Sequence, residues 1–182
     1  MTATPLSIPD LLLIKPKVFE DERGYFFESF NQEAFEMATG LTTVFVQDNE
    51  SLSRKGVLRG LHFQAPPHAQ AKLVRVVHGA VYDVAVDLRK GSPTYGQWDG
   101  ALLTAANKHQ LYVPEGFAHG FAVMDHDTIF AYKCSGYYHK ASEVCIAWND
   151  PAIDINWPVE VPIISQKDRE DALAFQTFES PF

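Results

Sequence analysis

The chain has 182 residues and a formal net charge of −8 at pH 7, which argues against general binding to nucleic acid or anionic membranes. Its hydrophobic content of 46% and charged content of 21% are typical of a soluble globular protein, expected as one domain over residues 1–182. Two cysteines form no disulfide framework, and neither a secretion signal nor a run of ~20 apolar residues is found. The sequence therefore predicts a cytoplasmic protein.

Short apolar runs separated by Gly, Pro, Asn and Asp predict many strands joined by turns. Some runs alternate with a period of two, so that Val81, Asp83, Ala85 and Asp87 share one face of a strand. In chain order the expected strands are Leu11–Lys17, Gly24–Ser29, Val44–Glu50, Val57–Phe63, Lys72–His78, Ala80–Leu88, Gln97–Leu103, Gln110–Val113, His119–Val123, Thr128–Cys134 and Val144–Trp148.

Helical patterns are confined to two short segments. Asn31–Ala38 begins with a good N-cap residue and is followed by Gly40, a typical C-terminal glycine. Ser165–Asp168 resembles a capping box at the start of a second helix. Many short strands with a few short helices indicate an all-β barrel or sandwich, and we expect a double-sheet jelly roll.

The first segment that could carry chemistry is Leu58–Gln64, in which a histidine stands between two apolar residues of a strand. His62 points to the face opposite Leu61 and Phe63. If those two side chains pack between the sheets, His62 faces outward; if the barrel interior is polar, His62 lies in a cavity. A lone histidine is more often structural than functional, but basic residues follow closely here.

Lys72 is the second candidate, because it begins an apolar strand where a long cationic side chain is unexpected. It either meets an anion or simply extends its charged end into solvent at the strand end.

The third candidate is His119, in the segment Pro114-Glu115-Gly116-Phe117-Ala118-His119. This Pro-x-Gly-x-x-His pattern is similar to the second motif of cupins, double-stranded β-helix proteins in which the histidine often binds a metal. The first cupin motif usually carries His-x-His, whereas this chain has His62-Phe63-Gln64 with a lysine further on. Two histidines and an ammonium make a poor cation site, so we expect no metal.

The whole chain resembles the dTDP-4-dehydrorhamnose 3,5-epimerases, a cupin-like family. The resemblance rests on segments that run in family order from near residue 15 to near residue 175. Arg59-Gly60-Leu61-His62-Phe63-Gln64, taken together with the tyrosine-rich and Lys-Asp segments, is specific, whereas any one segment alone is weak. The matching segments are Phe19–Phe26, Gln47–Asn49, Leu58–Gln64, Lys72–Arg75, Val113–Phe121, Tyr132–Tyr138 and Ser165–Asp168.

The resemblance implies inversion of C3 and C5 in dTDP-4-dehydro-6-deoxy-D-glucose, which yields dTDP-4-dehydro-L-rhamnose. Both carbons are α to a ketone, so inversion requires a base on one face, an acid on the other and a stabilised enolate. The family's base matches His62, oriented by a carboxylate at Asp168; Lys72 lies beside the C4 oxygen, and Tyr132 matches the acid. Reversible proton transfer needs no redox cofactor, and none is expected.

Simpler explanations exist for two of these residues when the pattern is taken alone. Tyr132 fits equally well as an ordinary strand aromatic residue. Asp168 is better explained as part of the cap of the helix begun by Ser165. Only the register of the family resemblance favours the catalytic interpretation.

The resemblance also implies a set of residues that bind the nucleotide and the sugar. Guanidinium groups suit a diphosphate, and aromatic rings suit the thymine base. In the family the N-terminal strands pair with a second subunit, so a homodimer is expected in which the segment of Phe19 and Arg23 reaches the partner's site. The expected binding residues are Phe19, Arg23, Glu28, Gln47, Asn49, Arg59, Lys72, His119, Tyr138, Glu143 and Lys167.

Two features of these residues remain open from the sequence. Asp21–Gly24 is also a plausible hairpin tip, which on pattern alone explains Arg23. Arg59 and His62 differ in parity and would lie on opposite faces of a straight strand, unless Gly60 marks a bulge.

Three other functions share parts of this pattern. A relative that inverts only C3 would use the same base. A metal-dependent cupin oxygenase would bind iron or manganese, and a non-catalytic sugar-binding cupin would keep the pocket without needing His62, Lys72 and Tyr132 together.

Overall fold

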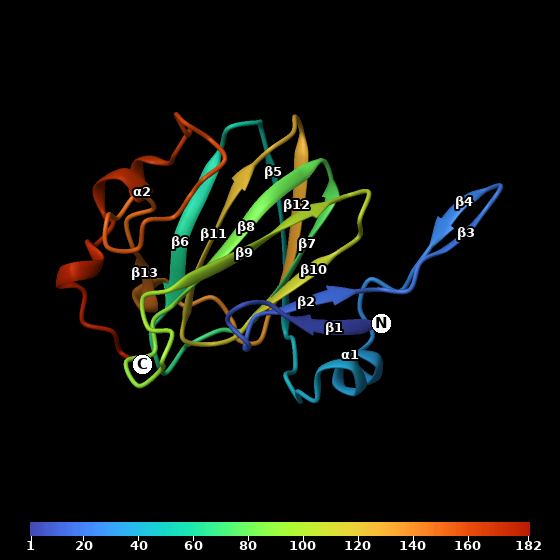
Figure 1. Ribbon diagram of the computed structural model, residues 1–182, viewed down its shortest axis with the longest axis horizontal. Coiled ribbons are helices and arrows are strands. Elements are labelled where there is room, and N and C mark those ends of the chain that lie inside the picture. Colours follow the sequence, from blue (N-terminus) through green and yellow to red (C-terminus); the bar gives the residue numbers. More distant parts are fainter.

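The computed structural model describes residues 1–182, which form two facing antiparallel β-sheets with a separate hairpin (Figure 1). The larger sheet has six strands in the order β1-β2-β10-β7-β12-β5. These are β1 (Thr2–Pro5), β2 (Leu12–Lys15), β10 (Gln110–Val113), β7 (Lys72–His78), β12 (Thr128–Cys134) and β5 (Gln47–Ser53). None of the helices is long and apolar enough to cross a membrane.

The smaller sheet has five strands in the order β13-β6-β11-β8-β9. Its strands are β13 (Glu143–Cys145), β6 (Leu58–Gln64), β11 (Phe117–Val123), β8 (Ala80–Asp87) and β9 (Trp98–Thr104). Every strand pair in both sheets is antiparallel. The expected jelly roll of the double-stranded β-helix type is thus confirmed.

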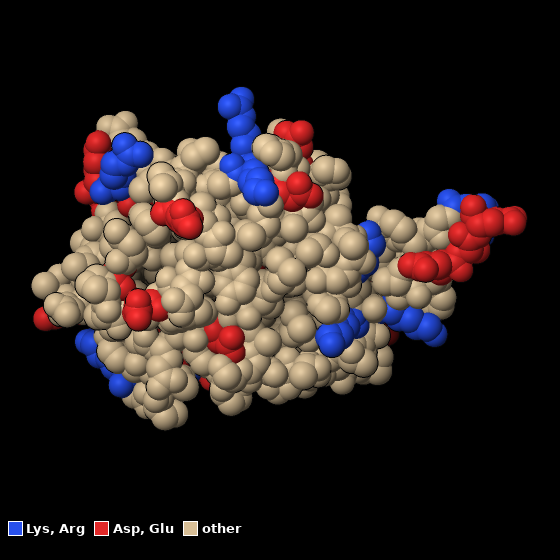
Figure 2. Space-filling view, turned by 45° about the horizontal axis from the view of Figure 1, so that its top comes forward, with Lys and Arg blue, Asp and Glu red and all other residues tan.

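A hairpin of β3 (Phe19–Asp21) and β4 (Gly24–Phe26) projects away from the two sheets. Its tip is the predicted turn, in which Asp21 accepts a hydrogen bond from the Arg23 amide at 2.9 Å. Figure 2 shows the acidic and basic side chains gathered on this arm. Its aromatic side chains are exposed, with Phe19 at 52%, Tyr25 at 56% and Phe26 at 67%.

The two α-helices begin where the capping patterns place them. Helix α1 (Gln32–Thr39) follows Asn31, whose side chain accepts from Ala34 N, and it ends at Gly40 in the left-handed region. Helix α2 (Gln166–Glu170) follows Ser165, whose hydroxyl accepts from the Asp168 amide at 3.0 Å. The single-turn segments η1 (Lys140–Ser142) and η2 (Phe175–Thr177) lie before β13 and near the C-terminus.

The main core lies between the sheets, and a second cluster covers the outer face of the smaller sheet. Leu61 and Phe63 belong to this second cluster, where the Phe63 ring lies 5.6 Å from that of Phe178 in the C-terminal segment. Because neighbouring side chains in a strand alternate, His62 points to the space between the sheets. Of the two orientations left open by the sequence, the one with His62 in the interior is therefore correct.

Arg59 and His62 differ in parity, and a β-bulge at Gly60 explains how both side chains can still face the same side of the strand. In the pairing of β6 with β11, His62 is opposite His119 and Arg59 is opposite Phe121, so three steps along β6 match two along β11. The extra residue turns both side chains toward one cavity. Gly60 has a φ of +129°, and an added Cβ would lie 2.5 Å from the Gly120 Cα.

Three predicted strands have the observed bounds, and the others differ at their ends. Lys72–His78, Gln110–Val113 and Thr128–Cys134 are correct, whereas the strand expected from Val44 begins at Gln47 and ends at Ser53. The strands expected to end at Ser29 and Trp148 end earlier, at Phe26 and Cys145. The short exposed strands β1 and β3 were not predicted.

Gly60→Ala is expected to lower the free energy of unfolding by more than about 2 kcal/mol, because its methyl group collides with backbone where L side chains are already strained. Gly24→Ala is the matched control, since Gly24 has a similar φ of +125° but open space around it. Urea denaturation of both variants measures the difference. Equal losses for the two variants would contradict the close crossing of β6 and β11.

Candidate active site

The cavity between the sheets receives side chains from both of them. His62 extends from β6 of the smaller sheet, whereas Lys72 from β7 and Tyr132 from β12 extend from the larger sheet. All three line the same cavity of about 150 Å³, together with His119 and Arg59. An imidazole on one wall therefore faces an ammonium and a phenol on the other.

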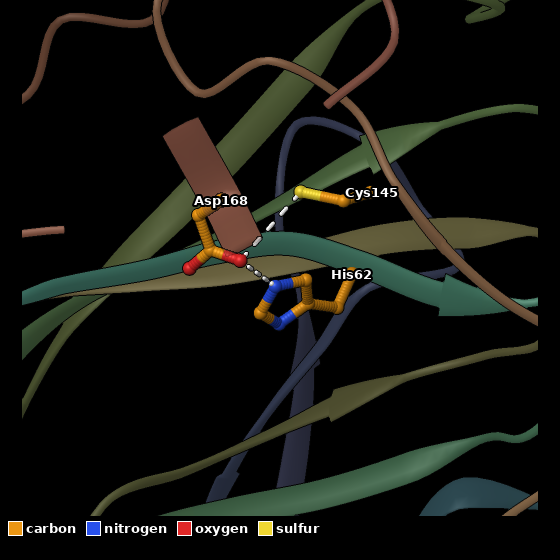
Figure 3. A group of neighbouring side chains, drawn as sticks. All are labelled: His62, Cys145 and Asp168. Carbon is orange, nitrogen blue, oxygen red and sulfur yellow. Dashed lines mark hydrogen bonds and ion pairs between the residues drawn. The ribbon is translucent and has the colours of Figure 1, made fainter. Parts of the chain in front are cut away.

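His62 is held by a carboxylate from the C-terminal helix (Figure 3). Its Nε2 lies 2.6 Å from Oδ1 of Asp168, and the Asp168 side chain is only 3% exposed. Burial alone would raise the pKa of Asp168, but hydrogen bonds from His62, Ser165 and the Gly60 amide hold that pKa below its usual range. The ionised carboxylate accepts the Nε2 proton, so the neutral tautomer of His62 has its free electron pair on Nδ1.

Cys145 completes the group of side chains around Asp168 in Figure 3. Its Sγ lies 3.8 Å from Asp168 Oδ1, the oxygen that His62 also contacts. Burial first, and then the Asp168 charge, raises the pKa of Cys145 to about 12. The thiol is therefore protonated at neutral pH and acts as a weak donor, not as a nucleophile.

These three residues are also the one group of histidine, cysteine and acidic side chains with donor atoms close enough to consider a metal ion. The His62 and Asp168 donor atoms are 2.6 Å apart, at hydrogen-bonding distance from each other. Two ligands of one ion normally lie further apart than this, and the third ligand would be a neutral thiol. The geometry fits a histidine–carboxylate pair better than a metal centre.

Lys72 and Tyr132 are polar side chains whose surroundings shift their pKa values. Burial lowers the pKa of Lys72, an effect opposed by nearby Cys134, Asp83 and Glu143. Burial raises the pKa of Tyr132, so its phenol stays protonated well above neutral pH. The ammonium Nζ lies 3.5 Å from the backbone oxygen of His62, which places it beside the base.

A second histidine–carboxylate pair lies deeper in the barrel. Nε2 of His119 lies 2.9 and 3.0 Å from the two carboxylate oxygens of Asp83. Both residues are buried, with His119 at 6% and Asp83 at 0% exposure. The neighbouring strands β8 and β11 bring them together, one from each.

The side chains around the entrance of the cavity are polar and form hydrogen bonds with one another. Glu143 accepts hydrogen bonds from the Tyr138 hydroxyl, at 2.8 Å, and from the ammonium group of Lys167. Gln47 accepts from the Tyr138 amide at 3.0 Å and donates to Asn49 at 3.0 Å. Residues from β5, β13 and α2 are thus linked around the entrance.

Most of the sequence-predicted site residues meet in this region, and three do not. Arg59 lines the cavity from β6 and donates to Ser53 at 3.2 Å. Phe19 and Arg23 lie on the projecting hairpin, where the Arg23 side chain is 85% exposed and pairs with Asp21. Glu28 is exposed and accepts from Asn31 at 3.1 Å, outside the cavity.

Sequence reasoning did not single out Asp83, Cys145 or Gln64 as contributors to the site. Gln64 donates to the His68 carbonyl at 2.7 Å and accepts from the His139 amide, which ties together two loops near Tyr138. The sequence did contain an indication for Asp83, because this acidic residue shares a strand face with Val81 and Ala85, which belong to the main core. A charge on a core face indicates a polar partner across the barrel.

A jelly roll whose interior carries a histidine–carboxylate pair, a partly buried lysine and a protonated tyrosine defines a cupin-like enzyme suited to proton transfer. Comparison with known proteins gives the particular family. The sequence model of the family described as dTDP-4-dehydrorhamnose 3,5-epimerase matches residues 5–175. The chain belongs to this family.

Its relatives are similar over nearly the whole chain. The dTDP-4-dehydrorhamnose 3,5-epimerase of Shigella flexneri is 56% identical over 168 residues, covering 92% of this chain and 93% of that protein. The 3,5-epimerase of Legionella pneumophila, solved in complex with dTDP-4-keto-L-rhamnose, has a TM-score of 0.93 and 48% identity, covering 98% of this chain and 94% of that chain. A 3'-monoepimerase of Streptomyces bikiniensis, solved with dTDP-quinovose, has a TM-score of 0.87 and 34% identity. The match covers 96% of this chain and 87% of that chain.

The contact between Cys145 and Asp168 predicts how the thiol reacts. Asp168→Asn removes a charge that raises the pKa of Cys145, so alkylation by iodoacetamide at about pH 8 is expected to become severalfold faster. Cys134, also buried, is the internal control. Mass spectrometry of the alkylated peptides measures both rates, and equal acceleration at the two cysteines would contradict a specific contact with Asp168.

Proposed function

We propose that this protein epimerises dTDP-4-dehydro-6-deoxy-D-glucose at C3 and C5, giving dTDP-4-dehydro-L-rhamnose. One observation carries the proposal: the His62 imidazole on one sheet faces the Tyr132 phenol and the Lys72 ammonium on the other, across a single cavity. Inversion at a carbon next to a ketone needs these three groups and their opposed placement.

Proton removal is assigned to His62. Its Nδ1 carries a free electron pair because the Asp168 carboxylate accepts the Nε2 proton. When Nδ1 takes a proton from C3 or C5, the C–H electron pair moves into the ring and the C4 oxygen gains negative charge. Asp168 then stabilises the imidazolium, as the carboxylate does in other histidine–carboxylate pairs.

Stabilisation of the enolate is assigned to Lys72. Its ammonium lies in the cavity wall beside His62, where little water competes for the charge. A cation fixed in position before the reaction stabilises developing negative charge without the cost of reorganising solvent.

Return of the proton is assigned to Tyr132. Because its pKa is raised, the phenol holds its proton until a base as strong as an enolate faces it. Protonation from the larger sheet after removal toward the smaller sheet inverts the carbon. The phenolate and the imidazolium then exchange protons with solvent, so the cycle is redox-neutral and needs only these side chains.

The nucleotide is assigned to the entrance of the cavity. Arg59 and Lys167 supply positive charge that suits a diphosphate, and both line the pocket that opens beside His62. Tyr138, a residue that is 56% exposed, offers a stacking surface for the base. Gln47, Asn49, His119 and Glu143 supply the remaining polar contacts to nucleotide or sugar.

We further propose that the chain works as a homodimer in the cytoplasm, with residues 1–182 as one cupin-like domain. The hairpin supports the dimer, because Phe19 and Arg23 are exposed on an arm that points away from the chain's own cavity. In a symmetric dimer such an arm contacts the partner reciprocally. Phe19 then faces Tyr138 of the partner's site across the thymine base, with Arg23 and Glu28 on the same segment.

Deuterium exchange tests the reaction. In D₂O with the dTDP-linked 4-keto-6-deoxyglucose, deuterium is expected at both C3 and C5, as detected by NMR and mass spectrometry. Deuterium at C3 alone would indicate the narrower activity of a 3'-monoepimerase, such as the Streptomyces relative. Absence of exchange at both carbons would contradict the proposal.

Two substitutions separate the base from the acid. His62→Ala is expected to abolish exchange at both carbons, a loss of at least roughly 10³-fold. Tyr132→Phe is expected to slow product formation or change its configuration more than it slows the first proton removal. Undiminished exchange in His62→Ala would overturn the assigned base.

Hybrid dimers test the shared site. His62→Ala subunits refolded with Phe19→Ala/Arg23→Ala subunits form hybrids in which one site has both defects and the other has none. About a quarter of wild-type activity is therefore expected from a random mixture of two inactive parents. Parents that stay inactive after demonstrated exchange of subunits would contradict a hairpin that completes the partner's site.

A further inference from the structure

Asp83 is a buried acidic residue for which the proposed reaction has so far no use. It extends from β8 into the barrel on the same face as Val81 and Ala85, and none of its surface is exposed. A buried carboxylate is costly unless compensating charge and hydrogen bonds surround it. Such a residue between the core residues Val81 and Ala85 indicates a specific partner.

Two partners are present, and both belong to the proposed site. His119 lies within hydrogen-bonding distance of both carboxylate oxygens, at 2.9 and 3.0 Å. Burial raises the pKa of Asp83, and the contact with His119 and the charge of Lys72 oppose that rise. Asp83 in turn opposes the fall that burial causes in the pKa of Lys72, which lines the same cavity as His119. The three residues thus form a cluster in which the buried Asp83 carboxyl is bonded to His119 and the partly buried Lys72 ammonium acts on both.

The protonation state of His119 follows from the same group. Burial lowers the pKa of His119, and Lys72 and His62 add to this effect against the attraction of Asp83. His119 is therefore neutral, and Nε2 carries its proton because the carboxylate is the acceptor there. The other nitrogen, Nδ1, is then an acceptor that suits a sugar hydroxyl better than a phosphate oxygen.

We propose that Asp83 is a positioning residue for this reaction: its carboxylate keeps the Lys72 ammonium charged and holds His119 with Nε2 protonated. The proposal rests on the proposed function, because it explains how the enolate-stabilising cation keeps its charge in a partly buried position. Asp83 acts through Lys72 and His119 and need not touch the substrate.

The expected pH dependence has a definite sign. Burial already lowers the pKa of Lys72, and Asp83 opposes that fall. Removing the Asp83 charge lowers the Lys72 pKa further, so the ammonium is lost at a lower pH. The alkaline limb of kcat/KM, where Lys72 loses its proton, is expected to move to lower pH.

Other ionisable groups face Lys72 and are unchanged by a substitution at position 83. Glu143 and Cys134 favour its charged form. The remaining neighbours that line the same two pockets are His62, Arg59, His119, Tyr132, Tyr138 and Glu50.

Asp83→Asn tests the proposal, because the amide keeps the shape and removes the charge. The alkaline limb is expected to fall by about one pH unit or more, with kcat reduced roughly 10- to 100-fold near neutral pH. Asp87→Asn is the matched control: Asp87 lies on the same strand, is equally buried and binds Arg89, Ser92 and Thr94. The control is expected to lower Tm without moving the pH profile.

Two NMR measurements on the free protein separate this proposal from the proposed function. Nitrogen shifts of ¹⁵N-histidine report the His119 tautomer, and the ¹³Cε shift of labelled lysine, assigned with Lys72→Met, reports the Lys72 titration. In Asp83→Asn the Lys72 titration is expected to move to lower pH. An unmoved Lys72 titration, or wild-type His119 protonated on Nδ1, would overturn the role of Asp83 whether or not the protein turns over its sugar.

Lys72→Met gives a second measurement should Asp83→Asn fail to fold. Two interacting groups shift each other by equal amounts, so loss of the ammonium is expected to raise the pKa of Asp83 and of His119. If neither titration moves in Lys72→Met, the cluster is not coupled and the proposal fails.

Discussion

The hydrogen bond between His62 and Asp168 is the contact on which the rest of the site depends. It joins a strand of the smaller sheet to a short helix 106 residues further along the chain, and so fixes the C-terminal segment against the barrel. The bulge at Gly60 makes the contact possible, because it turns His62 inward and presents the Gly60 amide to the same carboxylate. The tautomer of the base thus follows from the path of the backbone.

The two-sheet architecture explains how one cavity keeps the proposed acid and the proposed base apart. His62 and Tyr132 lie on opposite walls; Asp168 orients the His62 ring, and burial keeps the Tyr132 phenol protonated. The charged form of Lys72 needs additional stabilisation, because burial lowers the pKa of its ammonium group. Cys134 on β12 and the acidic residues Asp83 on β8 and Glu143 on β13 oppose that effect, so both sheets contribute to the electrostatics around the ammonium.

The fold class and most of the cavity residues could be predicted from the sequence, and two elements show why. The strand Thr128–Cys134 has correct bounds because polar turns flank an alternating run, and Ser165 marks the start of α2 by its capping chemistry. The strand β1 was not predicted, because a four-residue, mostly exposed strand has too few residues to show an alternating hydrophobic pattern. The partner of His62 could not be derived from local pattern, since Asp168 reaches it only through the tertiary fold.

The central claim is that Asp168 presents His62 as a base at Nδ1. A long-range ¹H–¹⁵N correlation spectrum of ¹⁵N-histidine-labelled protein at neutral pH tests it directly, with His62 assigned by its loss in His62→Ala. The account predicts a His62 protonated on Nε2 in the wild type, with that preference weakened in Asp168→Ala. A His62 protonated on Nδ1, or a tautomer that is the same in both proteins, would contradict it.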